Sequence, residues 1–256
     1  MINTNTAIAV AKAVALMLVA SSAHAQVTNL VTNGGFELTT PANQSVRLIP
    51  NSLVSGVTGW TTSSQWALDI KPSDIPNAVW TTQNGGPNLV TPSPDGGNFL
   101  FMDGDVTLHG AVSQNISGLK AGDNYQLSFY SGLAQQTQHY GPTWDWMMVS
   151  LGSQQQTAWA TGNHATDMPE HGFTGWQSFN MTFQATAATE TLSFLAYGGP
   201  TGAPPITLLD GVSLVDVTTP PVPEPEEWAM MLVGAGLVSY QVRRKQATLE
   251  QTKLDA

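Results

Sequence analysis

The chain has 256 residues, no cysteine, 10% charged residues and a formal net charge of −10 at pH 7. Without cysteine it can form no disulfide, thiolate nucleophile or Cys-ligated metal site. Between its two terminal segments, thirteen acidic residues stand against three basic ones, Arg47, Lys71 and Lys120. So few cations form no basic patch, which excludes nucleic acid and disfavours an anionic membrane surface as partners of this part. The acidic balance suits Ca²⁺ and neutral or cationic partners.

Residues 1–25 are expected to be a secretory signal peptide with a short helical apolar core. Lys12 precedes the apolar run Ala13–Ala20, and Ala23-His24-Ala25 places small residues at the two positions that a signal peptidase recognises. An N-terminal core helix is the alternative. The pattern predicts export.

Residues 26–217 are expected to form one all-β domain. Short runs of alternating apolar and polar residues are separated by turn residues such as those of 118–123, and no long stretch has a helical period. Leu68–Phe99 contains five prolines, which predicts long loops at one end of a sandwich, where binding residues often lie. Many strands without intervening helices favour an antiparallel sandwich. The predicted strands are 110–116, 125–130, 147–151, 176–183, 190–196 and 206–217.

Four short motifs of this domain resemble the galactose-binding-like jelly rolls, a group that includes carbohydrate-binding modules of families 4 and 9. They are the opening Asn29–Glu37, the turn Gly59-Trp60, the paired strands Val112–Ile116 and Tyr125–Phe129, and the closing Leu208–Leu214. The resemblance implies an antiparallel jelly-roll β-sandwich. It says less about the ligand, because this fold hosts many functions.

The same resemblance implies a structural Ca²⁺. Glu37 and Asp210 match the positions that supply carboxylates in those modules, and Gly35 matches a backbone carbonyl ligand. Six to eight oxygen ligands suit Ca²⁺, and such an ion can pin the first strand to the last. A third carboxylate is expected from Asp69 or Asp95, and no motif selects between them. Alternatively, Glu37 and Asp210 merely cap turns.

Aromatic residues supply the candidate ligand site. Trp144 and Trp146 should share one face of a strand, since alternate residues do, and an exposed pair of indoles is a platform for sugar rings. Both indoles could instead pack into the sandwich, as is expected of Trp60, Trp159 and Trp176. The candidate ligand-binding residues are Trp80, Tyr140, Trp144 and Trp146, with Gln135, Gln136, Gln138 and Asp145 as a polar rim.

Two further groups carry possible chemistry. His164, Asp167, Glu170 and His171 could bind Zn²⁺, but their spacing matches no helical zinc signature, and a solvated loop is the alternative. Asp103, Asp105 and Asp145 offer the paired carboxylates of a glycosidase, yet nothing in the sequence places two of them in one cleft. The sequence has no Gly-x-Ser-x-Gly elbow and no phosphate-binding loop. The domain is therefore expected to be non-catalytic.

The C-terminal segment has three parts in fixed order. After a linker at 218–221, residues 222–246 carry a Pro/Glu element, an apolar run Trp228–Tyr240 and a basic cluster. The run is about 13 residues, shorter than the roughly 20 of a comfortable membrane span, so a short transmembrane helix is expected. Basic residues would hold its far end, with the tail 247–256, in the cytoplasm. The defining residues are Val222, Pro223, Glu224, Pro225, Arg243, Arg244 and Lys245.

This order of elements resembles the PEP-CTERM sorting signal of exported proteins of Gram-negative, exopolysaccharide-producing bacteria. The resemblance implies transient anchoring in the inner membrane and processing by an exosortase. The chain is thus expected to be an exported, surface-sorted, non-catalytic protein that binds or organises extracellular polysaccharide in a biofilm matrix. A structural or adhesive protein without a glycan site, or a weak glycoside hydrolase, are the alternatives.

Overall fold

The computed structural model of the chain describes residues 28–42, 44–48, 56–63, 66–159, 166–218, 234–241 and 243–244. It divides into two units, Met1–Val217 and Thr218–Ala256. The predicted signal peptide, Val222–Pro225, Lys245 and the tail 247–256 lie outside the described residues. In the second unit, residues 234–241 are helical, as are Arg243 and Arg244, and the side chains of Leu237, Val238 and Tyr240 are exposed. Within the described ranges, no helix combines the length and apolar character that a membrane crossing requires.

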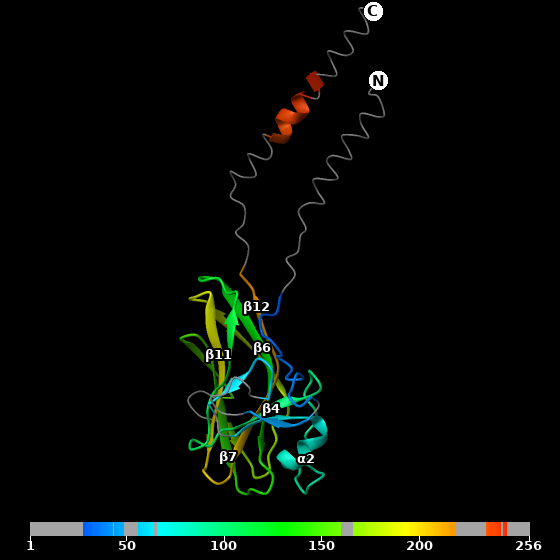
Figure 1. Ribbon diagram of the computed structural model, residues 1–256, viewed down its shortest axis with the longest axis vertical. Coiled ribbons are helices and arrows are strands. Elements are labelled where there is room, and N and C mark those ends of the chain that lie inside the picture. Colours follow the sequence, from blue (N-terminus) through cyan, green and yellow to red (C-terminus); the bar gives the residue numbers. More distant parts are fainter. Residues whose placement is uncertain are drawn as a thin grey trace, which may run out of the picture. The chain divides into compact units, whose positions relative to one another are not determined.

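The first unit is a sandwich of two antiparallel sheets (Figure 1), which confirms the predicted all-β jelly-roll class. One sheet has the order β1-β3-β4-β12-β6-β10 and the other β2-β5-β11-β7-β8, with β9 also paired to β7. The first sheet contains β1 (Val46–Arg47), β3 (Ala67–Ile70), β4 (Phe99–Asp103), β12 (Pro205–Asp216), β6 (Asn124–Gln135) and β10 (Gln177–Gln184). The second contains β2 (Thr61–Thr62), β5 (Val112–Ser117), β11 (Thr189–Gly199), β7 (Thr143–Leu151), β8 (Gln154–Ala158) and β9 (Thr166–Met168).

The main core lies between the sheets and follows from strict alternation along the strands. In β7, every second residue from Thr143 to Leu151 is buried, and in β11 Leu192, Phe194 and Ala196 point inward. This period of two is the reason that these sequences form half-buried strands. Trp60 is 1% exposed and lies at the centre, with ring centroids 5.2 Å from Phe36 and 6.2 Å from Phe194. Its predicted core position is therefore confirmed, while Trp159 and Trp176 are only partly buried at the edges of the two cores.

A second, smaller core covers the outer face of the first sheet. Phe99 and Phe101 of β4 and Leu208 of β12 pack there against Ile75 and Val79. Ile75 belongs to the short helix α2 (Ile75–Ala78), which follows the 3-10 turn η1 (Pro72–Asp74) and lies beside β4 in Figure 1. The prediction of loops throughout 68–99 was therefore wrong in part, because proline is well accommodated in the first turn of a helix.

The opening segment 28–37 docks on the last strand, β12. The amide of Leu30 donates to the carbonyl of Leu214, and the amide of Val212 donates to the carbonyl of Gly34. A Cβ added to Gly34 would lie 1.9 Å from the carbonyl oxygen of Val212, so only glycine permits this approach. The pairing of β12 with β6 shifts register between Asp210 and Ser213, at a bulge where Gly211 has φ +60°.

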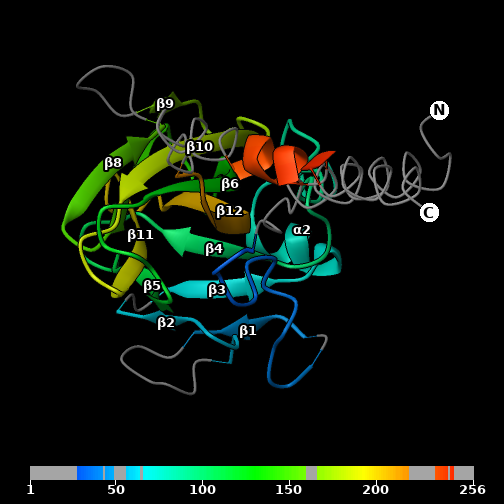
Figure 2. The ribbon, with the colours of Figure 1, turned by 90° about the horizontal axis from the view of Figure 1, so that it is seen from above.

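Glutamine side chains join the edges of the two sheets. Figure 2 shows β8 and β10 next to each other at one side of the sandwich, although they belong to different sheets. The side-chain amide of Gln156 donates to the carbonyl of Thr182 at 2.7 Å, and that of Gln154 donates to the carbonyl of Gln184. Backbone carbonyls on the outer edge of β10 therefore have partners without a further strand.

Replacement of Gln156 by alanine should lower the free energy of unfolding by about 0.5–1.5 kcal/mol, the usual net value of one hydrogen bond. Urea denaturation would measure it. Gln155, the exposed neighbour on the same strand, is the matched control, and Gln155→Ala should change stability by less than about 0.5 kcal/mol. Equal effects of the two substitutions would show that the side-chain link contributes nothing.

Candidate functional site

The outer face of β7 carries the predicted pair of indoles. Trp144 is 38% exposed and Trp146 is half-buried, while Asp145 between them points inward and is 1% exposed. The expectation that Trp144 and Trp146 share a face thus agrees with the alternation of β7, and neither indole packs into the sandwich core. Asp145 lies on the opposite face and cannot serve in a polar rim.

The neighbouring strand β11 holds both indoles in place. Tyr197, opposite Trp146, stacks on it with ring centroids 4.5 Å apart and planes 7° from parallel. Gly199, opposite Trp144, leaves the space that its indole fills, since an added Cβ would lie 2.7 Å from a ring carbon. His109 meets Tyr197 edge-on at 4.6 Å. The aromatic face consists of these four side chains: Trp144, Trp146, Tyr197 and His109.

Sequence reasoning did not identify Tyr197, Gly199 or His109. Tyr197 shares one face of its strand with Leu195 and Ser193, because alternate residues do, and this places it on the outer side. Only the register between β7 and β11 puts it beside Trp146, and no local signal in the sequence fixes that register.

The other two predicted aromatic residues form a separate group. The indole of Trp80 stacks on His171 at 3.9 Å and lies 5.5 Å from Tyr140. Trp80 is only 8% exposed, and its indole N–H donates to the carbonyl of His139 at 2.8 Å, so it offers little surface to a ligand. Tyr140 is 63% exposed. The structure therefore divides the four predicted ligand-binding residues into two pairs.

The polar residues predicted around the site are also divided. Gln135 is fully buried: it accepts from the amide of His171 and donates to the carbonyl of Gly141. It therefore supports the Trp80 group and cannot line a rim, whereas Gln138 is exposed. Of the predicted zinc cluster, Glu170 lies 3.4 Å from His171, Asp167 is exposed on β9, and His164 lies outside the described residues.

A group of acidic residues gathers where the opening segment meets the bulge of β12. A Cβ added to Gly35 would lie 2.8 Å from a carboxylate oxygen of Asp95 and 4.0 Å from one of Asp210. The carboxylate of Glu37 lies against Gly97 and accepts from the amide of Asn98 at 2.6 Å. The structure thus brings together Glu37, Asp210 and Gly35, which the sequence singled out.

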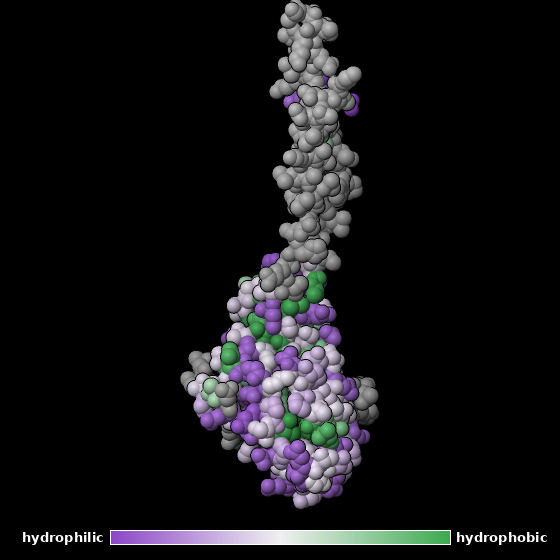
Figure 3. Space-filling model, turned by 90° about the vertical axis from the view of Figure 1, so that its right-hand side faces the viewer, coloured by the Kyte–Doolittle hydropathy of each residue, from purple (hydrophilic) through white to green (hydrophobic). Residues whose placement is uncertain are grey.

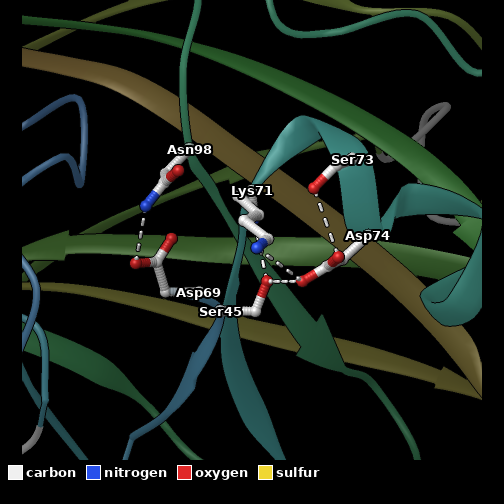
Figure 4. Close-up of polar contacts among 6 residues, drawn as sticks. All are labelled: Ser45, Asp69, Lys71, Ser73, Asp74 and Asn98. Carbon is white, nitrogen blue, oxygen red and sulfur yellow. Dashed lines mark hydrogen bonds and ion pairs between the residues drawn. The ribbon is translucent and has the colours of Figure 1, made fainter. Parts of the chain in front are cut away.

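Both candidates for the third carboxylate, Asp69 and Asp95, lie in this group. Figure 4 shows the side-chain amide of Asn98 donating to one oxygen of Asp69, at 3.2 Å. Lys71 is two residues away, but its ammonium group is directed at Asp74, 3.9 Å distant. The buried carboxyl of Asp69 therefore forms no ion pair with this lysine.

Among the residues that the structure describes, the buried carboxyls of this acidic group have too few hydrogen-bond donors and no ion-paired cation to stabilise their ionised forms. Burial raises the pKa of Asp69 to about 7, with Glu37 adding to the effect, and the pKa of Asp210 to about 8, with Asp95 and Glu37 adding. The hydroxyl of Ser93 and the amide of Gly211 lower the pKa of Asp210, yet neither of its buried oxygens has a hydrogen bond of normal geometry. One oxygen of Asp69 also lacks a partner. Buried oxygens without partners are costly, and a cation would relieve that cost.

The donor set fits Ca²⁺ in chemistry, since it consists of carboxylate and carbonyl oxygens. In the described part of the chain, no three His, Asp or Glu side chains already stand close enough to coordinate one ion. A bound ion would therefore have to draw these carboxylates together.

Asp103, Asp105 and Asp145, the carboxylates considered for glycoside hydrolysis, lie at the other end of β4. They are 3%, 2% and 1% exposed. Asp105 accepts from the amide and hydroxyl of Thr107, which lower its pKa, and Asp145 accepts from the hydroxyl of Thr207. Because all three are buried, none is placed to contact a sugar chain as the structure stands.

Figure 3 shows the side of the domain on which α2 lies, where polar residues dominate and apolar ones form small separate patches. A hollow of about 240 Å³ beside α2 is lined mainly by apolar side chains, among them Pro72, Ile75, Pro76 and Val90. Ile75 and Val90 belong to the second core, so the hollow is a surface opening of that core.

Comparison with known proteins finds no matching family model. A stretch of 204 residues, 78% of this chain, is 28% identical to halomucin from Haloquadratum walsbyi, of which it spans only 2%. Solved structures of similar topology include a family 61 carbohydrate-binding module in complex with β-1,4-galactotriose, with 15% identity and a TM-score of 0.41 over 73% of this chain and 97% of the module. Another is an arabinose-bound α-L-arabinofuranosidase, with 16% identity and a TM-score of 0.42 over 75% of this chain and 27% of that enzyme.

Replacement of Gly199 by alanine should displace the indole of Trp144 from β11 while the fold is retained, because the added Cβ meets a movable ring. Acrylamide quenching of tryptophan fluorescence should increase. Ser193→Ala, on the same face of β11, is the control and should leave quenching unchanged. Unaltered quenching in Gly199→Ala would mean that Trp144 does not depend on the space at Gly199.

Proposed function

We propose that the domain is a non-catalytic glycan-binding module whose ligand lies on the outer face of the second sheet. The observation that carries this proposal is the aromatic face: Trp144 stands exposed over Gly199, and Trp146 is held flat against Tyr197. Indole faces of this kind suit the apolar faces of sugar rings.

Hydroxyl groups continue the same face beyond the aromatic rings. Ser113, Ser193 and Ser150 stand opposite one another on β5, β11 and β7. The hydroxyls of Ser150 and Ser193 are 2.7 Å apart, and those of Thr61 and Ser113 are 3.2 Å apart. Ser150 follows Trp146 by four residues, about 13 Å along a strand. This face therefore combines apolar surface and hydrogen-bonding groups over more than the size of one sugar ring.

The domain has three basic residues against thirteen acidic ones, and this negative net charge favours a neutral polysaccharide over an acidic one. Each site would bind weakly, and retention would come from many copies engaging one polymer, since linked weak sites gain avidity without new contacts. Display on the surface of a Gram-negative bacterium, through processing by signal peptidase and exosortase, is part of this proposal. It rests on residues 1–25 and 222–246 of the sequence.

Replacement of Trp144 or Trp146 by alanine should weaken binding to a neutral polysaccharide about five- to thirtyfold, as expected for loss of a stacked ring worth roughly 1–2 kcal/mol. Affinity electrophoresis against a panel of neutral and acidic polymers would measure it. Trp66 is 39% exposed, close to the exposure of Trp144, and Trp66→Ala is the matched control.

Three results would count against this function. Retardation of the wild type that persists in both variants would exclude the aromatic face. No retardation by any polymer, with concentration-dependent self-association, would favour the adhesive alternative. Release of reducing ends would favour hydrolysis.

We also propose a structural Ca²⁺ in the acidic group, held by Glu37, Asp210, the carbonyl of Gly35 and one or both of Asp69 and Asp95. The support is the pair of buried carboxyls without adequate partners at the point where the opening segment docks on β12. When bound, the ion would supply positive charge to these oxygens and strengthen the docking.

Addition of Ca²⁺ after EDTA treatment should raise the Tm of the wild type. At a hundredfold excess of Ca²⁺ over its Kd, the free energy of unfolding should increase by about 2.7 kcal/mol. Asp210→Asn should lose most of this gain, yet in EDTA it should be at least as stable as the wild type, because it removes a buried carboxyl whose ionisation is disfavoured there. Asp123→Asn, a control that removes a partly exposed carboxylate paired with Lys120 outside the acidic group, should keep the full response. A Tm that changes with neither EDTA nor Ca²⁺ would refute the calcium site.

A further inference from the structure

Asp145 occupies an unusual place beneath the aromatic face. It lies on β7 between Trp144 and Trp146, and its side chain points between the sheets with 1% of the residue exposed. The strand that presents the two indoles to solvent therefore also carries a carboxyl into the interior.

Only one of the two oxygens of the Asp145 carboxyl has a hydrogen-bond partner. One oxygen accepts from the hydroxyl of Thr207 on β12, at 3.1 Å, which links the two sheets. The other oxygen is buried without a partner, over the backbone of Gly104, where an added Cβ would lie 3.2 Å from it. The backbone N–H of Trp146 also lowers the pKa of Asp145, so the carboxyl lies next to the backbone that carries Trp146.

The surrounding titratable groups come from each element packed at this end. Three of these groups lie at the end of β4 and in the turn after it: Asp103, Asp105 and His109. The others lie on separate elements: His139 in the loop before β7, Tyr197 on β11 and the exposed Asp167 on β9. Lys71 and Lys120, the two lysines of the domain, are engaged elsewhere with Asp74 and with Asp123 and Asp216. Burial raises the pKa of Asp145 well above its ordinary value of 3.8, and the charge of Asp103 raises it further.

We propose that Asp145 makes glycan retention by the aromatic face depend on pH, with full retention while its carboxyl is protonated and weaker retention once it is ionised. This inference rests on the proposed glycan-binding function. An ionised carboxylate between the sheets is poorly compensated, and the strand can lower that cost by moving its first residues toward water. Such a movement would lift Trp144 from Gly199 and Trp146 from Tyr197.

The direction follows from linkage. A carboxyl whose pKa is higher in the folded than in the unfolded chain contributes its full stability below about pH 4. That contribution is lost as the pH rises from there through the folded-state pKa. Retention should therefore be greatest in mild acid and decrease toward alkaline pH.

The test is affinity electrophoresis of the full chain between pH 5 and pH 10 on a polymer that retards it, with the Tm followed over the same range. In the wild type, the association constant should fall at least about fivefold toward high pH, and in Asp145→Asn less than about twofold. Thr207→Val removes the donor that favours the ionised form, so it should move the midpoint upward by about half a pH unit or more. Asp216→Asn, which removes an exposed charge far along β12, should follow the wild type.

Each outcome decides between the proposals. A pH profile shared by the wild type and Asp145→Asn, or a flat wild-type profile, would overturn the inference and leave glycan binding intact. If Asp145→Asn does not fold, an unmoved midpoint in Thr207→Val overturns it as well. No retardation at any pH by any polymer would refute the proposed function, and this inference with it.

Discussion

The domain depends on the close approach of its opening segment to its last strand. Gly34 lies against Val212 at a distance that no side chain permits, and the bulge beside Gly211 gives β12 the shape that receives it. The indole N–H of Trp60 donates to the carbonyl of Asn33, so this docking also fixes the central ring of the core. Glu37 and Asp210 meet only because of it. This one backbone contact thus determines how the opening segment docks on the last strand, where Trp60 lies in the core and where the acidic group forms.

The two sheets differ in what covers them. The second core and α2 pack on the outer face of the first sheet, which removes much of that surface from contact with a ligand. The outer face of the second sheet keeps Trp144 and Tyr197 accessible or partly so. Alternation along β7 then places solvent-directed rings and an interior carboxyl on adjacent residues. A binding surface and the electrostatics beneath it are therefore inseparable in this strand.

The sequence predicted those features that depend on residues close together in the chain. Alternation from Tyr125 to Tyr130 predicted part of β6, and a period of two predicted that Trp144 and Trp146 share a face. It was uninformative where long-range packing decides: prolines near Pro72 suggested loops, but tertiary contacts of Ile75 stabilise a short helix. The register that sets Tyr197 beside Trp146, and the burial of Trp80 and Gln135 by neighbouring segments, likewise depend on residues far apart in the chain.

The glutamine links between β8 and β10 have a consequence for neighbouring molecules. An edge strand with free carbonyls is a template on which a second chain can add, and this leads to aggregation. Gln154 and Gln156 occupy carbonyls of β10 with side chains of the same molecule, so a strand from another copy would first have to displace them. Where many copies lie close together, strand addition at this edge of the domain is therefore disfavoured.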